Sequence, residues 1–364
     1  MKILFLGHLN EGQTSRMRME ELRRLGHEVA VLSSQALWSN ASWLSRQLQQ
    51  RIARGPVVSQ LNERLVTLAR TYKPDLLWAD KQEHIYPETL ETLRRLGILL
   101  LHFTPDPYFT LRWKRTHLMD VSLPLFDYLV TSKRYELPAY RATGREVIYM
   151  PLGFSESAHR PLSPRDHPNR ERFTGDIAFI GGWEPRREAL LAALGTTDAD
   201  LRIWGYAWDH LVDGRWTPRR AYRLRLLAGA DAFRIAVNPI IQTAYRGGEV
   251  YGDEYAWALS GAKINVGFLR TVWPDQHTTR TFEIPACASM LLADRTDEHR
   301  EFFEEGVEAE FFASTEELLD KARYYLQNEA VRARMAMNGY ERCHRSGYSY
   351  RERVGMVLRQ IDIR

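Results

Sequence analysis

The sequence predicts an α/β protein made of two Rossmann-like, doubly wound domains. Two observations support this prediction. A strand, a glycine-bearing loop and a helix open the chain, and the same succession restarts near residue 176. After each opening, short apolar runs alternate with amphipathic stretches, which is typical of parallel sheets covered by helices. With 364 residues, the chain is long enough for two such domains.

The first domain is expected over residues 1–154. Residues 2–6 have the apolar character of a buried strand, and residues 15–25 form a helical pattern that ends at Gly26. Further strands are expected over residues 28–32, 75–79, 97–103, 128–131 and 146–150. Two amphipathic helices are indicated by Leu44, Leu48 and Ile52 and by Leu61, Leu65 and Leu68, and such apolar faces usually pack on a core.

The second domain is expected over residues 176–347. Residues 155–175 are rich in proline and charge and are predicted to be a linker. Strands of the second domain are expected over residues 176–180, 201–204, 233–237, 263–266 and 290–293. Residues 348–364 are predicted to form a C-terminal helix that returns to the first domain.

Composition excludes several classes of protein. Hydrophobic residues make up 44% and charged residues 26%, which argues against a disordered or collagen-like chain. Cys287 and Cys343 form neither a zinc motif nor a disulfide framework, so a cytoplasmic location is expected. The start of the chain does not resemble a signal peptide, and no apolar run is long enough to span a bilayer. The net charge of +4 tolerates an anionic ligand but does not favour a nucleic-acid partner.

Two basic segments are candidate surfaces. Trp38 and Trp43 lie near arginines 46, 51 and 54, which suits an acceptor surface, peripheral contact with a membrane, or simply a helix that faces the core. The second segment surrounds Trp216 and Tyr222 with five arginines, at positions 215, 219, 220, 223 and 225. This segment suits an anionic partner, although a solvated helix face explains it equally simply.

The residues between Gly247 and Asp294 carry the clearest chemical signal. Thr279 and Arg280 precede a helix expected over residues 281–288, so backbone N–H groups, hydroxyls and a guanidinium form an anion site. Glu283 in the first turn is suited to accept hydrogen bonds from ribose hydroxyls. Together these features favour a nucleoside diphosphate. The alternative is that Thr279 only caps the helix and Glu283 only complements its dipole.

The stretch from residue 252 to residue 353 resembles the donor domain of GT-B glycosyltransferases. It is most similar to the CgeB-like, spore-maturation glycosyltransferase family, with a glycosyltransferase group 1-like C-terminal domain. The matching residues are Ala262–Val266, Asp275, Thr279–Cys287, Glu298–His299, Phe303–Gly306 and Gly347–Tyr350. Before residue 252 the resemblance is architectural, although Tyr149–Phe154 is similar to the segment where such enzymes pass between domains. The resemblance implies a GT-B fold, with the active site in a cleft between the domains.

The resemblance also implies roles for two carboxylates. Asp275 and Glu283 have the E-x7-E spacing of retaining GT-B enzymes, with Asp in place of the usual first Glu. In those enzymes the second carboxylate binds the donor ribose, and the first lies near the donor sugar. A nucleotide-diphosphate sugar would be the co-substrate, and no cofactor or essential metal is expected.

Other donor-binding residues are expected at strand ends and glycine turns, where Rossmann sheets bind ligands. Gly182 would let the backbone approach a phosphate, and Arg186 or Arg187 would neutralise it, although both arginines also suit a solvated helix. The complete predicted donor-binding set is Gly12, Gly182, Arg186, Tyr251, Gly252, Lys263, Thr279, Thr281 and Glu283.

Four residues are predicted to act in catalysis: His8, Asp106, Asp275 and Arg280. Arg280 would stabilise the leaving diphosphate. Asp106 lies between two prolines at a strand end, where it could act as the base for the acceptor, with His8 as a second candidate. A rigid Pro-Asp-Pro turn explains Asp106 equally well.

The predicted function is transfer of a sugar from a nucleotide-diphosphate sugar to an acceptor hydroxyl. Two alternatives stay open: a nucleotide-sugar epimerase or phosphorylase on the same fold, and a non-catalytic protein that binds nucleotide sugars. The sequence identifies neither the sugar, the base, the acceptor nor the oligomeric state. It also leaves open retention or inversion at the sugar, and a nucleic-acid acceptor is not favoured.

Overall fold

The computed structural model describes residues 1–39, 41–111, 115–163, 167–213 and 237–361. These residues form two compact units, one of residues 1–152 with 350–364 and the other of residues 153–349. The arginine-rich segment 215–225 and most of the strand expected at 233–237 lie outside the described residues. In the ranges described, no helix is long and apolar enough to cross a bilayer.

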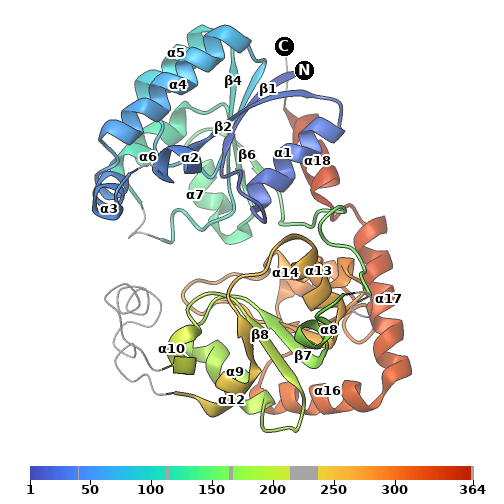
Figure 1. The fold of residues 1–364 in the computed structure, drawn as a ribbon. Coiled ribbons are helices and arrows are strands. Elements are labelled where there is room, and N and C mark those ends of the chain that lie inside the picture. Colours follow the sequence, from blue (N-terminus) through green and yellow to red (C-terminus); the bar gives the residue numbers. More distant parts are fainter. Residues whose placement is uncertain (40, 112–114, 164–166, 214–236, 362–364) are drawn as a thin grey trace. The chain divides into compact units, whose positions relative to one another are not determined.

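The first unit contains alternating strands and helices (Figure 1). Its strands are β1 (Lys2–Gly7), β2 (Glu28–Ser33), β3 (Leu76–Asp80), β4 (Leu99–Thr104), β5 (Tyr128–Thr131) and β6 (Glu146–Tyr149). Its α-helices are α1 (Thr14–Arg24), α2 (Ser34–Ser39), α3 (Trp43–Ile52), α4 (Pro56–Tyr72), α5 (Pro87–Arg95), α6 (His117–Ser122), α7 (Leu137–Arg141) and α18 (Tyr350–Gln360). Two short 3₁₀ helices are η1 (Leu123–Leu125) and η2 (Arg134–Glu136).

The described strands of the first unit form a six-stranded parallel sheet in the order β2-β1-β3-β4-β5-β6. Successive side chains of β1 point to opposite faces of this sheet. Leu4 and Leu6 pack in the core with α4 and α5, whereas Ile3 and Phe5 pack in the core with α1 and α18. From β1 the chain adds β2 on one side, and it then crosses to the other side of β1 to add β3 and the strands that follow. The strand order therefore reverses between β1 and β3. In open α/β sheets such a switch point is where ligands bind.

The C-terminal helix α18 belongs to the first unit, as predicted. Val354 and Val357 of α18 are buried with Met19 and Leu22 of α1, and Figure 1 shows the two helices side by side. The Arg18 guanidinium of α1 lies over the ring of Phe103 in β4 and over the ring of Tyr350 in α18. This part of the predicted fold is confirmed.

The second unit repeats the alternation of strands and helices. Its strands are β7 (Gly175–Ile180), β8 (Leu201–Trp204), β9 (Tyr245–Gly247), β10 (Ala262–Gly267), β11 (Met290–Asp294) and β12 (Glu310–Phe312). Its helices are α8 (Arg170–Phe173), α9 (Pro185–Leu194), α10 (Asp209–Asp213), α12 (Pro239–Ala244), α13 (Gly252–Ser260), α14 (Arg280–Ala286), α15 (Asp297–Phe302), α16 (Thr315–Gln327) and α17 (Glu329–Arg345).

The described strands of this unit form a second six-stranded parallel sheet, in the order β12-β11-β10-β7-β8-β9. Its switch point lies between β7 and β10. The two predicted doubly wound sheets are therefore confirmed. The segment expected to be a linker contains α8, and its His159 and Phe173 are buried in the second unit.

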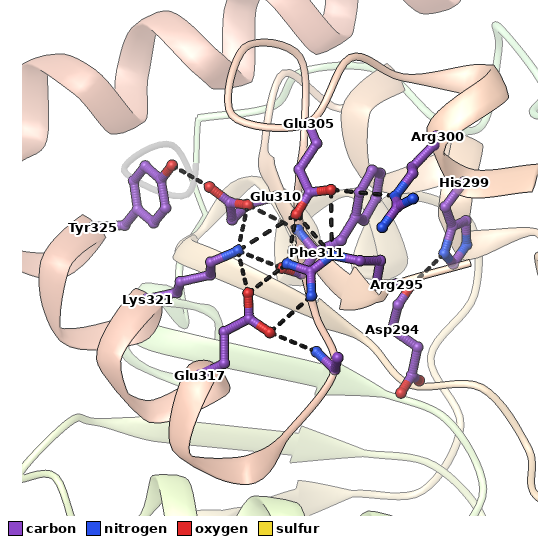
Figure 2. Close-up of polar contacts among 11 residues, drawn as sticks. Asp294, Arg295, His299, Arg300, Glu305, Glu310, Phe311, Glu317, Lys321 and Tyr325 are labelled. Carbon is purple, nitrogen blue, oxygen red and sulfur yellow. Dashed lines mark hydrogen bonds and ion pairs between the residues drawn. The ribbon is translucent and has the colours of Figure 1, made fainter. Parts of the chain in front are cut away.

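A charged network ties the edge of this second sheet to α16 (Figure 2). Arg295, which follows β11, lies 2.6 Å from Glu305 and donates a 2.9 Å hydrogen bond to Glu317. Lys321 of α16 lies 2.8 Å from both Glu310 and Glu317. Because opposite charges alternate through this network, its partly buried charges compensate one another. The network therefore holds the residue after β11 in place and, with it, the carboxyl end of that strand.

Two buried histidines, His102 in β4 and His299 in α15, predict that stability depends on pH. Burial lowers the pKa of each from 6.5 to about 4. Between these values the unfolded chain binds the proton and the native state does not, so stability falls as the pH falls from 6.5 toward 4. Each histidine should contribute up to about 1.4 kcal/mol per pH unit.

Urea unfolding across this pH range measures the effect. The two histidines lie in different units, so His299→Gln should flatten the pH dependence of the transition that reports the second unit. An unchanged pH dependence in this variant would contradict the role of His299.

Candidate functional site

The loop after β7 is shaped by close packing against the loop after β8. The Trp208 indole donates a 2.8 Å hydrogen bond to the carbonyl of Gly181. A Cβ on Gly205, whose φ is +140°, would lie 2.0 Å from that same carbonyl oxygen. A Cβ on Gly182 would lie 2.3 Å from the ring of Tyr206. Gly182, which is predicted to approach a phosphate, thus also lets the Tyr206 ring pack against its loop, and Gly205 is required by the close approach of the two backbones.

Arg187 joins the loops on either side of the switch point. Its side chain is 1% exposed and donates hydrogen bonds of 2.9 Å to the Gly182 carbonyl and 3.0 Å to the Phe268 carbonyl. Its Nε has no hydrogen-bond partner among the described residues. Burial, together with the neighbouring Arg280 and Arg270, lowers the pKa of Arg187 to about 9. The guanidinium is therefore still charged at neutral pH.

Arg280 and Arg270 add positive charge around Arg187. Arg280 is the first residue of α14, and its buried Nε also lacks a hydrogen-bond partner within the described ranges. Arg270 lies 3.3 Å from the Glu184 carboxylate and donates a 2.7 Å hydrogen bond to the Tyr206 hydroxyl. Glu184 supplies negative charge next to Arg187 and Arg270, and one carboxylate beside three guanidinium groups leaves positive charge in excess. An anion with several oxygens would compensate it.

Arg186 pairs with a carboxylate rather than with the glycine loop. Arg186 forms an ion pair with Asp294 at the end of β11, in which Nη1 donates a 3.2 Å hydrogen bond to Oδ2. The same carboxylate accepts a 2.7 Å hydrogen bond from the backbone N–H of Leu269. Of the two arginines considered from the sequence, Arg187 is therefore the one that contacts the glycine loop.

Glu283 is buried within α14, and both of its carboxylate oxygens face donors. The Tyr255 hydroxyl donates a 2.5 Å hydrogen bond to Oε2, and His159 Nε2 lies 3.6 Å from Oε1. Because His159 Nδ1 accepts the backbone N–H of Ser155, a neutral ring carries its proton on Nε2, toward Glu283. Burial raises the pKa of Tyr255 well above its usual range, and Glu283 raises it further.

The two predicted threonines have different positions at the start of α14. Thr279 precedes the helix, and its side chain makes no capping hydrogen bond. The Thr281 hydroxyl is buried, accepts the backbone N–H of Thr278 at 3.1 Å and lies 2.9 Å from His299 Nε2. Since His299 Nδ1 contacts the Asp294 carbonyl, Thr281 donates to Nε2. Thr281 therefore holds the start of the helix in place.

The remaining donor-side residues are placed as follows. Asp275 accepts a 2.7 Å hydrogen bond from the Trp273 indole. Gly252, with φ +56°, begins α13, and Tyr251 precedes Tyr255 by one helical turn. Burial and Glu249 raise the pKa of Tyr251 to about 12.

The structure does not bring Lys263 together with these residues. Lys263 is the second residue of β10 and forms a 2.7 Å ion pair with Asp176, the second residue of β7. Both residues lie at the amino ends of parallel strands. Gly182 and Arg270 follow the carboxyl ends of the same strands, at the opposite edge of the sheet.

The first unit brings the other predicted residues to its own switch point. Lys81, which follows β3, lies 2.8 Å from the Asp106 carboxylate and has an unusual φ of +56°. Burial opposes the charged form of Lys81, but Asp106 outweighs it and raises the pKa. Burial lowers the pKa of His8, which follows β1, and the nearby Lys81 lowers it further. Gly12, with φ +77°, lies in the loop between β1 and α1.

Several residues of these clusters were not predicted from the sequence: His159, Glu184, Tyr206, Tyr255 and Arg270. Arg270 could have been found, because it follows the strand expected at 263–266. The contact between His159 and Glu283 joins residues far apart in the chain, and no local pattern predicts it.

Comparison with known proteins places these clusters in context. Residues 186–359 match a protein family described as glycosyl transferase-like. No protein among the curated sequences matches the chain significantly.

Solved structures are similar over the whole chain. Sucrose-phosphate synthase from Thermosynechococcus elongatus aligns with a TM-score of 0.67 and 14% identity, covering 99% of this chain and 98% of that chain. HepE from Anabaena, solved in complex with UDP-glucose, aligns with a TM-score of 0.64 and 14% identity, covering 99% and 100%. An α,α-trehalose 6-phosphate synthase from Burkholderia multivorans aligns with a TM-score of 0.60 and 13% identity, covering 99% and 97%. The chain thus has the GT-B fold, and its residues 186–359 match the glycosyl transferase-like family.

Proposed function

We propose that the chain is a glycosyltransferase of the CgeB-like type that uses a nucleotide-diphosphate sugar. The observation that carries the proposal is the excess positive charge of Arg187, Arg270 and Arg280 beside the switch point of the second sheet. The segment that supplies these arginines matches the glycosyl transferase-like family. A diphosphate has several charged oxygens and would compensate this charge.

On this proposal, Arg280 stabilises the diphosphate as negative charge develops on the leaving group. Arg187 positions the Gly182 and Phe268 loops around it. Glu283 binds the ribose hydroxyls, with Tyr255 holding the carboxylate in place. We further propose that the reaction needs neither a metal ion nor a cofactor, because guanidinium groups supply the positive charge.

On the acceptor side, we propose that Asp106 receives the proton of the acceptor hydroxyl. The ion pair with Lys81 favours the ionised carboxylate, which is the form that a general base requires. The same ion pair also makes the carboxylate a weaker base, so the acceptor has to displace Lys81 in part. His8 follows β1, the strand next to β3, and would contact the acceptor as a neutral ring.

The first prediction concerns donor binding. Titration calorimetry with uridine, guanosine, adenosine and thymidine diphosphates, in the presence of a metal chelator, should identify one nucleotide that binds. Arg280→Ala should weaken this binding by about 1.5–3 kcal/mol, as expected for hydrogen bonds to charged groups. Arg280→Lys should restore part of the affinity, because lysine keeps the charge but lacks the planar fork.

Arg323→Ala is the matched control, because Arg323 is an exposed arginine of the same unit that pairs locally with Asp320. It should bind the nucleotide like the wild type. If none of the nucleotides binds to the wild-type protein, or if Arg280→Ala binds as tightly as this control, the proposed donor site is wrong.

The second prediction concerns Glu283. Glu283→Ala should weaken nucleotide binding by about 1.5–3 kcal/mol, because the ribose loses a charged acceptor. A 2′,3′-dideoxy nucleotide should then bind equally to the variant and to the wild type. Tyr255→Phe is informative as well, since it removes one donor to Glu283 while leaving the carboxylate. Unchanged affinity in a folded Glu283→Ala protein would rule out the ribose contact.

The third prediction concerns Asp106. Asp106→Asn preserves the shape of the turn, so donor binding and thermal stability should stay close to the wild type. Transfer to a weakly acidic hydroxyl should fall by about 10²–10⁴-fold. A more acidic acceptor should recover much of this loss, because it needs no base. If instead the melting temperature falls while transfer per folded molecule is intact, Asp106 is a turn residue.

A further inference from the structure

Helix α3 exposes its apolar side chains and buries a polar one. Leu44, Leu48 and Ile52 are spaced four residues apart, so they form one ridge along the helix. They are 71%, 61% and 55% exposed. Among the residues of α3, it is Gln49 that is buried. This pattern is the reverse of the amphipathic pattern that packs a helix on a core.

Polar contacts attach the opposite side of α3 to the first unit. Gln49 Oε1 accepts a 2.9 Å hydrogen bond from the backbone N–H of Val57 in α4, while a 2.7 Å bond from its Nε2 to Ser45, within α3, orients the amide. The carbonyl of Gln50 lies 3.3 Å from His84 Nε2. The described contacts therefore hold the helix with its ridge facing outward, and folding of this unit does not bury the three aliphatic side chains.

The charged residues of the segment that carries the ridge are all basic. No Asp or Glu occurs between residues 29 and 62, although a quarter of the chain is charged, whereas arginines stand at positions 46, 51 and 54. Arg51 and Arg54 are exposed. An exposed aliphatic ridge with arginines beside it suits an interface in which a layer of anionic groups covers an apolar interior.

We propose that α3 binds the surface of a bilayer that contains anionic lipids. Leu44, Leu48 and Ile52 would enter the boundary between headgroups and acyl chains, while Arg51 and Arg54 would contact lipid phosphates. A second copy of the chain fits this face less well, because a two-fold contact would bring the arginines of the two copies together. The proposal rests on α3 alone and is independent of the proposed transfer reaction.

Flotation of the full chain with vesicles tests the proposal. Vesicles of phosphatidylcholine with about 30% phosphatidylglycerol should carry the protein, and vesicles of phosphatidylcholine alone should carry little of it. The double variant Leu44→Gln and Leu48→Gln should bind at least about tenfold more weakly. Arg51→Gln and Arg54→Gln should each weaken binding by about fivefold, and added salt should reduce the wild-type affinity.

Met337→Gln is the matched control, because Met337 is a half-exposed apolar residue on α17 of the other unit. It should bind vesicles like the wild type, and all variants should unfold at similar temperatures because these side chains are exposed. The proposal is overturned if the wild-type protein does not float with anionic vesicles, or if the leucine variant floats as well as the control. It is also overturned if sedimentation shows a dimer that the leucine variant abolishes and the vesicles are not bound.

Discussion

The hydrogen bonds from Arg187 to the carbonyls of Gly182 and Phe268 hold the second unit together at its switch point. A buried guanidinium is costly unless its donors are satisfied, so these two carbonyls determine where the arginine can lie. The arginine in turn fixes the spacing of the loops after β7 and β10. Gly205 permits the close approach of the loop after β8, because any side chain there would collide with Gly181. The spacing of the loops after β7 and β10 thus follows from one buried cation.

Arg187 also contributes to the excess of positive charge at the carboxyl ends of these strands. Glu184 compensates part of the charge through Arg270, but Arg280 and Arg187 each retain a buried Nε without a hydrogen-bond partner in the described chain. Uncompensated charge lowers stability, and natural sequences tolerate this mainly at functional sites. The charged network around Arg295 has the opposite character, because its carboxylates and cations neutralise one another (Figure 2). The Arg295 network is balanced within itself, whereas the arginine cluster has the excess positive charge on which the proposed donor site rests.

Most of the fold could be predicted because buried parallel strands are apolar runs that end in polar loops or glycines. Strands β9 and β12 were not predicted, because each has only three residues, too few to show a hydrophobic periodicity. The position of Lys263 could have been derived, because the second residue of a parallel strand lies at the edge away from the ligand. The contact of His159 with Glu283 could not, since it depends on tertiary packing. For α3, a helical period reveals an apolar face but not the direction in which it points.

The two switch points differ in charge, and this difference bears on what each one binds. In the first unit, the cation of Lys81 is matched by Asp106, and the adjacent His8 is kept neutral by burial. In the second unit, cations outnumber the carboxylate beside them. A matched pair suits a neutral ligand such as a sugar hydroxyl, whereas excess cations suit a diphosphate. The same topology, used twice with different residues after the strands, thus supports an acceptor role for one unit and a donor role for the other.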